Sequence, residues 1–442
     1  MCRKLSSILS MFSFLFSFLG SQAQSINYCI SGRFAENDFY SPLAIVSTYD
    51  LVYGNNNDYQ GINQDLKLDI HYPNLSVDPL NKRPLVLIIH GGSYYSGSKS
   101  DFTAYALQLA RRGYVAVTVQ YRLGWDYIGT GLPCGGNING FRYAAYRSLQ
   151  DVKACLRYLA FHASNYGIDT EQFFLMGQSA GAFTAMHCAF MQQQEADLVF
   201  PAAYADLGPI DSVSNNLYAN YQLSGVFNWC GGILDTNAMN ANEQIPVLSI
   251  HGLLDNVVPV DTGAFLGCNN ISNPYPFVYG PKAIQRRMKN IGHCSVNNFD
   301  ADGMHCVYPS LEPVVYIPSK FTCFFKGLLC GDCETEEKIG YSSPACMDAA
   351  PTKLETQTSD HSWVVYPNPS SDYLIIRFTP NHSGVVNIKL TNAQGAIHFS
   401  HSNWNHGLQK EMKIPVSSMK AGIYYLHVQS KEGLGVQKVI IH

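Results

Sequence analysis

The chain has 442 residues, an apolar content of 46% and a formal net charge of −4 at pH 7. This length permits two domains, and the apolar content permits a large core. The negative charge, together with the lack of any basic cluster, argues against nucleic acid as a partner.

The first residues have the pattern of a signal peptide. Arg3 and Lys4 give a positive start, residues 5–19 form an apolar run, and the small residues Ser21 and Ala23 occupy the cleavage positions. This pattern predicts a signal peptide over residues 1–23, with cleavage before Gln24. The alternative is an uncleaved anchor, which the short apolar run disfavours. Since no later stretch is apolar and long enough to cross a bilayer, we expect an exported protein with no stable membrane span.

Cysteine usage supports the same compartment. Twelve of the 13 cysteines lie beyond residue 23. In an exported chain this number predicts several disulfides, although the pairing does not follow from the sequence. Cys330 and Cys333 have a spacing that also occurs in redox and zinc sites. No second pair with a matching spacing is evident, so we favour disulfides and expect no metal.

Beyond the leader, predicted strands alternate with predicted helices. Strands are expected over residues 66–72, 84–90, 114–121, 173–176, 202–207, 246–251 and 294–299. Helices are expected over residues 102–112, 141–162 and 281–291, and after residue 179. The glycine-rich residues 125–139 are interpreted as a long loop over the active face. This alternation predicts an α/β fold, a mostly parallel sheet with helices on both faces.

One strand-to-helix turn carries a chemical motif. Gly177-Gln178-Ser179-Ala180-Gly181 fits G-x-S-x-G. A turn of this kind raises the serine hydroxyl with little cover, and the helix behind it directs N–H groups and partial positive charge to the same place. The pentapeptide alone is a weak signal, but its position between a strand and a helix makes it specific. We therefore predict Ser179 as a nucleophile.

A serine nucleophile needs a base and an acid, and the chain offers both in the order Ser, Asp, His. Asp255 follows a buried strand and is the predicted acid. His293 and His305 are both candidates for the base. The strand predicted over residues 294–299 would put His293 at its start, on the wrong side of the sheet, and His305 after its carboxyl end. We favour His305 and keep His293 as the alternative.

The predicted oxyanion hole comes from two loops. His90-Gly91-Gly92-Ser93 directly follows a predicted central strand, where glycine lets the backbone approach a substrate closely. The backbone N–H groups of Gly91, Gly92 and Ala180 are the expected donors. The alternative is a tight turn with no role in binding.

These motifs together resemble the α/β-hydrolase esterases, specifically the carboxylesterase and feruloyl or acetyl-xylan esterase branch, from about residue 50 to residue 330. The segments that carry the resemblance are His90-Gly-Gly-Ser93, Tyr121-Arg-Leu-Gly124, Asp151, Tyr166-Gly-Ile-Asp169, Gly177-Gln-Ser-Ala-Gly181 and His251-Gly-Leu-Leu-Asp255. The resemblance implies hydrolysis of carboxylic esters through an acyl-serine intermediate, without a cofactor. The chain departs from many relatives at Ser93, where they have a third glycine.

The end of the chain has a different character. Residues 334–361 are charged and polar and read as a linker, and residues 362–442 contain short alternating strands that predict a small β-sandwich. Val365-Tyr-Pro-Asn-Pro369, Ala421-Gly-Ile-Tyr-Tyr425 and Gln437-Lys-Val-Ile-Ile441 resemble the C-terminal sorting domain of type IX secretion substrates from Bacteroidota. The resemblance implies export by the type IX secretion machinery, with attachment to the cell surface or release. The alternative is a carbohydrate-binding or other adhesion sandwich.

The sequence thus predicts a catalytic domain over residues 24–333 followed by a linker and a sorting domain. The expected activity is that of a secreted serine carboxylic-ester hydrolase, acting on acetyl or feruloyl esters of polysaccharides or on short-chain acyl esters. Two alternatives stay open, a serine peptidase of the same fold and a non-catalytic surface binding protein.

Overall fold

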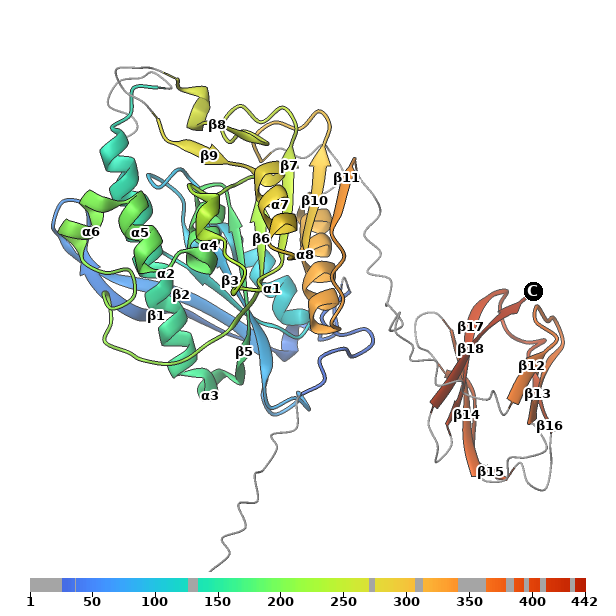
Figure 1. Cartoon of the computed structure of the whole chain (residues 1–442). Coiled ribbons are helices and arrows are strands. Elements are labelled where there is room, and N and C mark those ends of the chain that lie inside the picture. Colours follow the sequence, from blue (N-terminus) through green and yellow to red (C-terminus); the bar gives the residue numbers. More distant parts are fainter. Residues whose placement is uncertain are drawn as a thin grey trace, which may run out of the picture. The chain divides into compact units, whose positions relative to one another are not determined.

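The chain separates into two compact units, Met1–Ala349 and Ala350–His442 (Figure 1). The computed structural model describes residues 26–35, 37–125, 134–269, 275–306, 313–340, 363–378, 385–392, 397–405, 411–429 and 434–442. The predicted signal peptide, residues 126–133 of the predicted loop and most of the predicted linker lie outside these residues. Within the described ranges, no helix combines the length and the hydropathy needed to span a membrane.

The first unit is built on a nine-stranded sheet in the order β1-β2-β4-β3-β5-β6-β7-β10-β11 (Figure 1). The strands are β1 (Ile45–Asn57), β2 (Asn63–Pro73), β3 (Arg83–Ile89), β4 (Val115–Val119), β5 (Ile168–Gln178), β6 (Leu223–Trp229), β7 (Val247–Gly252), β10 (Ser295–Asp300) and β11 (Glu336–Ile339). β1 and β2 pair antiparallel, as do β2 and β4, and all pairs from β4 to β11 are parallel. The predicted mostly parallel sheet is confirmed.

Helices cover both faces of this sheet because the central strands are apolar on both sides. In β3, Leu85, Leu87 and Ile89 pack into the core beneath α2 (Ile138–Phe161), α4 (Ala180–Phe190) and α7 (Pro281–Asn290). Val86 and Ile88 point to the other face and pack with α1 (Thr103–Arg111) and α8 (Pro313–Leu329). A strand buried on both faces reads as a continuous apolar run, as residues 84–90 do.

The smaller elements complete the unit. They are the helices α3 (Ala163–Tyr166), α5 (Gln193–Val199) and α6 (Pro201–Leu207) and the antiparallel pair β8 (Thr262–Ala264) and β9 (Phe277–Tyr279). The strand predicted over residues 202–207 is wrong, because these residues form α6. Pro201 occupies the first turn of this helix, where its fixed φ suits the helix, and the alanines that follow favour the same conformation.

The predicted linker begins too early. Residues 336–339 form β11, which pairs in parallel with β10 at the edge of the large sheet. All four side chains of β11 are exposed and three of them are charged, as is common on edge strands. This composition explains why the segment reads as a linker in the sequence.

Several disulfides are present, as the cysteine content predicts. Within the described residues they join Cys29 to Cys330, Cys134 to Cys268, Cys230 to Cys306 and Cys294 to Cys333. Cys330 and Cys333 are close in sequence but bond to different partners, so they form neither a redox pair nor a shared metal site. Cys155 and Cys188 are free and buried.

The second unit is a small sandwich of two antiparallel sheets, ordered β12-β13-β16 and β15-β14-β17-β18. The strands are β12 (Trp363–Tyr366), β13 (Tyr373–Phe378), β14 (Val385–Asn392), β15 (Ile397–Asn405), β16 (Glu411–Pro415), β17 (Gly422–Gln429) and β18 (Leu434–Ile441). Alternate residues face the core, as in β13, where Leu374, Ile376 and Phe378 are buried. The predicted β-sandwich is confirmed.

Asp78 forms buried ion pairs with Arg33 and with Arg83, the first residue of β3. These ion pairs predict how the stability of the larger unit depends on acid pH. Asp78 Oδ2 lies 2.7 Å from Arg33 and 2.5 Å from Arg83, and all three side chains are buried. Burial raises the pKa of Asp78, but the hydrogen bonds from the two guanidiniums outweigh this effect and lower the pKa to about 2. A carboxyl whose pKa is lower in the folded state stabilises the fold above its unfolded pKa. That contribution, about 2 kcal/mol, is lost as the pH falls from about 4 to about 2.

Asp78→Asn should remove this pH dependence and destabilise the larger unit at neutral pH. We expect a loss of about 3–5 kcal/mol, because the substitution leaves two buried guanidiniums without a counter-charge. Urea unfolding at pH 7 and pH 3 measures both effects. An unchanged urea midpoint at pH 7 would contradict the role of this ion cluster.

Candidate active site

The candidate site is centred on the turn between β5 and α4. Ser179 links Gln178, the last residue of β5, to Ala180, the first of α4, with φ 52° and ψ −119°. Positive φ is uncommon for a residue with a side chain and costs conformational energy, so the surroundings must hold it. Ser179 N–H donates to Trp229 O at the end of β6 (2.9 Å), which ties the turn to the neighbouring strand. The predicted strand, turn and helix are confirmed.

The two glycines of the motif are required by close backbone approach. A Cβ added to Gly177 would lie 2.2 Å from Gly181 O, and a Cβ added to Gly181 would lie 2.1 Å from Ile89 O at the end of β3. Both gaps are too short for any side chain. The spacing of the motif therefore reflects how tightly the first turn of α4 is packed against β3 and β5.

Gly181→Ala should disturb the site through this contact. The added methyl must push α4 away from β3, so we expect a destabilisation of about 1–3 kcal/mol and displacement of Ser179. Reaction of Ser179 with a fluorophosphonate should slow by about 10²-fold, because ~1 Å misplacements have effects of this size. Ala189→Gly on the same helix is the matched control, since it costs about 1 kcal/mol of helix stability without adding an atom. Equal labelling rates for the two variants would contradict the packing argument.

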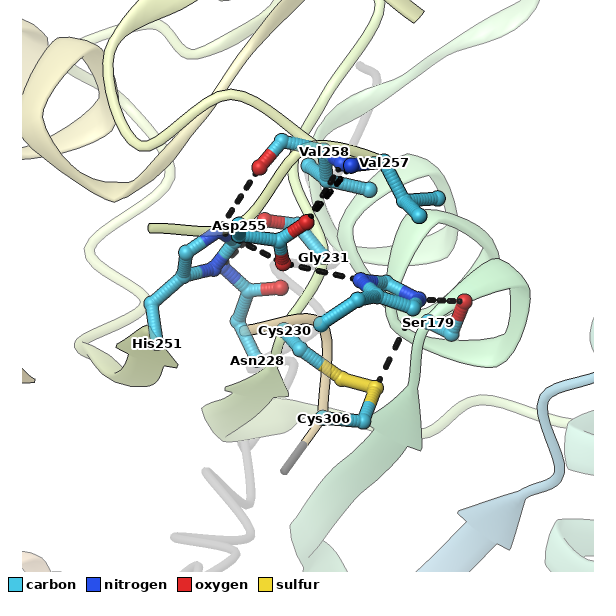
Figure 2. Close-up of a disulfide and its surroundings, with 10 residues drawn as sticks. Ser179, Asn228, Cys230, Gly231, His251, Asp255, Val257, Val258 and Cys306 are labelled. Atoms are coloured by element: carbon cyan, nitrogen blue, oxygen red, sulfur yellow. Dashed lines mark hydrogen bonds and ion pairs between the residues drawn. A yellow bond between two sulfur atoms is a disulfide. The ribbon is translucent and has the colours of Figure 1, made fainter. Parts of the chain in front are cut away.

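Three side chains predicted from the sequence meet at this turn. His305 Nε2 lies 2.9 Å from Ser179 Oγ, and His305 Nδ1 lies 2.8 Å from Asp255 Oδ2 (Figure 2). In the tautomer that satisfies both contacts, Nδ1–H donates to the carboxylate and Nε2 accepts from the hydroxyl. His293 directly precedes Cys294 and β10 and so lies at the amino end of that strand, whereas His305 follows its carboxyl end. The structure thus brings His305, and not His293, to Ser179.

Asp255 is buried and fully hydrogen-bonded. Its Oδ1 accepts from Val257 N (2.8 Å) and Val258 N (2.9 Å), and its Oδ2 accepts from His305 and lies 3.2 Å from His251 Nε2. Burial raises the pKa of this carboxyl, but the hydrogen bonds from the two histidines outweigh it and hold the pKa well below its usual range. The carboxylate therefore stays charged and can stabilise an imidazolium at His305.

His251 also contacts Asp255, and the sequence alone assigns it no role at this site. It lies on β7, and its Nε2–H is shared between Asp255 Oδ2 and Val258 O, the latter at 2.9 Å. The four-residue spacing from His251 to Asp255 was the available signal. On a strand followed by a loop, however, this spacing does not reveal that the imidazole turns back to contact the carboxylate (Figure 2).

The loop after β3 lies against Ser179. A Cβ added to Gly91 would lie 2.9 Å from Gln178 O and 3.3 Å from Ser179 Cβ, so the backbone of Gly91 closely approaches the turn. Gly92 has φ +102°, and its carbonyl accepts from Ser96 N (3.0 Å) within the loop.

Two buried tyrosines hold this loop and the first turn of α4. Tyr94 Oη donates to Ala180 O (2.9 Å), and Tyr121 Oη donates to His90 O (2.9 Å). The N–H of Ala180 belongs to the first turn of α4, where backbone N–H groups have no partner within the helix. The geometry therefore puts Gly91 and Ala180 beside Ser179, where their N–H groups could stabilise an oxyanion, with Gly92 next to them in the loop.

The topology and the chain order Ser, Asp, His define an α/β-hydrolase fold. Residues 45–202 match the model of the carboxylesterase family, and residues 364–442 match the model of the secretion system C-terminal sorting domain. The first match contains Gly91 and Ser179 but ends before Asp255 and His305. The relation of the last two residues to Ser179 therefore comes from the structure.

Curated relatives and solved structures are similar to parts of the chain. Esterase cest-33 of Caenorhabditis elegans is 36% identical over 121 residues, 26% of this chain and 20% of that protein. The Neuroligin-like protein glit-1 of the same organism is 31% identical over 118 residues, 26% of this chain and 15% of that protein. The chain thus matches these relatives over less than a third of their length. Thermogutta terrifontis esterase 2 phosphorylated by paraoxon is 17% identical, with a TM-score of 0.44 over 64% of this chain and 93% of that chain.

Proposed function

We propose that the chain is a secreted serine hydrolase of carboxylic esters. The observation that carries this proposal is the relay from Ser179 Oγ through His305 to Asp255, with contacts of 2.9 and 2.8 Å. The match of residues 45–202 to the carboxylesterase family supports the reaction class. The match of residues 364–442 to a sorting domain supports export through the type IX secretion machinery.

The geometry supports a two-step reaction through an acyl-serine. His305 Nε2 takes the proton of Ser179 as Oγ attacks the ester carbonyl, and Asp255 stabilises the imidazolium that forms. The negative oxygen of the tetrahedral intermediate would be stabilised by the N–H groups of Gly91, Gly92 and Ala180. His305 then protonates the leaving alkoxide, and the same groups activate a water molecule that releases the acid from Ser179.

A non-catalytic binding protein of the same fold is the weaker alternative. The region that matches esterases also matches proteins that are not named esterases, so similarity alone does not decide between the two. A binding role does not require a strained backbone at Ser179 or a buried charge behind His305. These features are costly for the fold and are expected where a hydroxyl must be activated.

The substrates that we infer are acetyl or feruloyl esters of polysaccharides or short-chain acyl esters, as the motifs around His90, Ser179 and Asp255 suggest. A serine peptidase would use the same relay, and therefore the test must compare esters with amides. The chain without its signal peptide should hydrolyse p-nitrophenyl acetate and at least one of methyl ferulate, acetylated xylan and p-nitrophenyl butyrate. Faster hydrolysis of an aminoacyl anilide than of every ester would favour the peptidase.

A further inference from the structure

His305 lies at the end of a short segment with few backbone ties. After β10, Leu253 N donates to Asp300 O (2.8 Å) and Leu254 N donates to Gly303 O (2.9 Å). Among the described residues, the next bond from this segment to the rest of the unit, apart from those of the His305 side chain, is the disulfide from Cys306 to Cys230. Residues 307–312 follow outside the described part of the chain. The covalent bond at Cys306 thus adjoins the proposed base.

The other half of this disulfide is anchored beside the nucleophile. Cys230 directly follows Trp229, whose carbonyl accepts from Ser179 N (2.9 Å), and Cys230 N donates to Ile250 O on β7 (2.8 Å). The disulfide therefore connects the backbone that holds Ser179 to the residue next to His305 (Figure 2). His305 is therefore tied to the Ser179 turn in two ways, by the hydrogen bond between its Nε2 and Ser179 Oγ and by the disulfide at the next residue, Cys306.

Both half-cystines have a strained backbone. Cys230 has φ 48° and Cys306 has φ 52°, in the left-handed region that residues with side chains rarely adopt. Such conformations persist only where the surroundings impose them. Because 76 residues separate the two cysteines, the disulfide is a long-range constraint that can impose both. Without it, Cys230 keeps its hydrogen bond to Ile250 O, but the backbone at Cys306 is free to relax, and His305 would move with Cys306.

We propose that the Cys230–Cys306 disulfide positions His305 and that ester hydrolysis requires this bond to be closed. This inference rests on the function proposed above. The bond forms when the two thiols exchange with a disulfide of a thiol–disulfide oxidoreductase: the chain loses two electrons and two protons, and the donor disulfide becomes a dithiol. The reducing cytoplasm disfavours this exchange, and the oxidising compartments outside it favour the exchange. The chain therefore gains activity only after leaving the cytoplasm.

Opening the bond has a second effect on the base. Cys306 Sγ lies 3.6 Å from His305 Nε2, and as half of a disulfide it has no proton to exchange. When a dithiol attacks the sulfur of Cys306, a half-buried residue, Cys230 leaves as a thiolate, and the second thiol of the reagent then releases Cys306. The freed thiol would compete with Ser179 for the imidazole nitrogen.

Metal capture by the opened site has to be excluded in any test. The ligand atoms of Cys230, His305 and Cys306 lie within 4.8 Å of one another, in the only such group found among the described residues. The closed disulfide is not a thiolate ligand, but two thiolates and an imidazole suit zinc. All reductions are therefore made with a chelator present, so that a loss of activity reports the opened bond itself.

The test compares two disulfides at opposite ends of β10. Cys230→Ala/Cys306→Ala opens the bond at the carboxyl end, and Cys294→Ala/Cys333→Ala, the matched control, opens the bond at the amino end. We expect kcat for p-nitrophenyl acetate to fall by about 10²-fold in the first variant, with KM within about threefold of wild type, and kcat to be kept in the second. A dithiol should inactivate the wild type reversibly and leave the residual activity of the first variant unchanged.

Each outcome bears on one claim. Wild-type kcat in a folded Cys230→Ala/Cys306→Ala variant would overturn the positioning role and leave the proposed function intact. Failure of the oxidised wild type to hydrolyse any ester or to react with a fluorophosphonate would overturn the proposed function itself. If the first variant does not fold, alkylation and mass spectrometry across a dithiol titration of the wild type decide the question. Activity must then follow the opening of Cys230–Cys306 and not that of Cys294–Cys333.

Discussion

Ser179→Ala is expected to lower kcat/KM for p-nitrophenyl acetate by about 10⁵-fold, close to the background rate. The reason is that Oγ is both the attacking atom and the group that His305 Nε2 contacts at 2.9 Å. The thermal midpoint should stay near that of the wild type, because alanine keeps the Cβ and loses a single, partly exposed hydrogen bond. Steady-state kinetics and thermal unfolding of the two proteins measure these effects.

Ser214→Ala is the matched control for this substitution. Ser214 also has a positive φ, of 68°, and its hydroxyl donates to the buried Asp151 at 3.1 Å, far along the chain from the predicted relay. This variant should lose stability by about 1 kcal/mol and keep its kcat. Comparable activity losses in the two variants would mean that the effect at Ser179 is structural.

His305→Ala should lower kcat by about 10⁴-fold or more, and His293→Ala should change it by less than about twofold. Among the described residues, His305 is the histidine that contacts both Ser179 and Asp255, with its two ring nitrogens 2.9 and 2.8 Å from them. His293 lies just before the first residue of β10, at the amino ends of the parallel strands, whereas Ser179 and Asp255 follow the carboxyl ends. Both variants are assayed on the same ester, with circular dichroism to verify folding.

The outcome of this pair is decisive for the assignment of the base. If His305→Ala keeps most of its activity and His293→Ala does not, the described positions of these residues are not those of the working enzyme. If both variants stay active, neither His305 nor His293 is the base, and the proposed relay is wrong.

The fold and the position of the candidate site follow from patterns that act locally. The run at residues 84–90 is apolar without interruption because β3 is buried on both faces, and this property alone predicts a central parallel strand. When strands alternate with helices, the strands run parallel, and their carboxyl ends lie together at one end of the sheet. This rule placed Ser179, Asp255 and His305 together and separated His293 from them.

The features that the sequence alone does not predict depend on tertiary packing or lie in segments too short to show a period. No local pattern pairs Cys29 with Cys330, 301 positions away, or turns His251 toward Asp255. The sequence assigns β11 to the linker because its exposed, charged side chains lack the alternation of a half-buried strand, and only its pairing with β10 defines it. Residues 202–207 were misassigned because six residues are too few to distinguish the periods of helix and strand.

Mass spectrometry of the protein quenched during turnover of p-nitrophenyl acetate tests the central claim most directly, namely that Ser179 is the nucleophile and His305 its base. The wild type should carry one acetyl group on the peptide that contains Ser179 within the first turnover, and His305→Ala should carry none on the same timescale. Acetylation of a different residue, or turnover of the ester without any acetylated protein, would contradict the account.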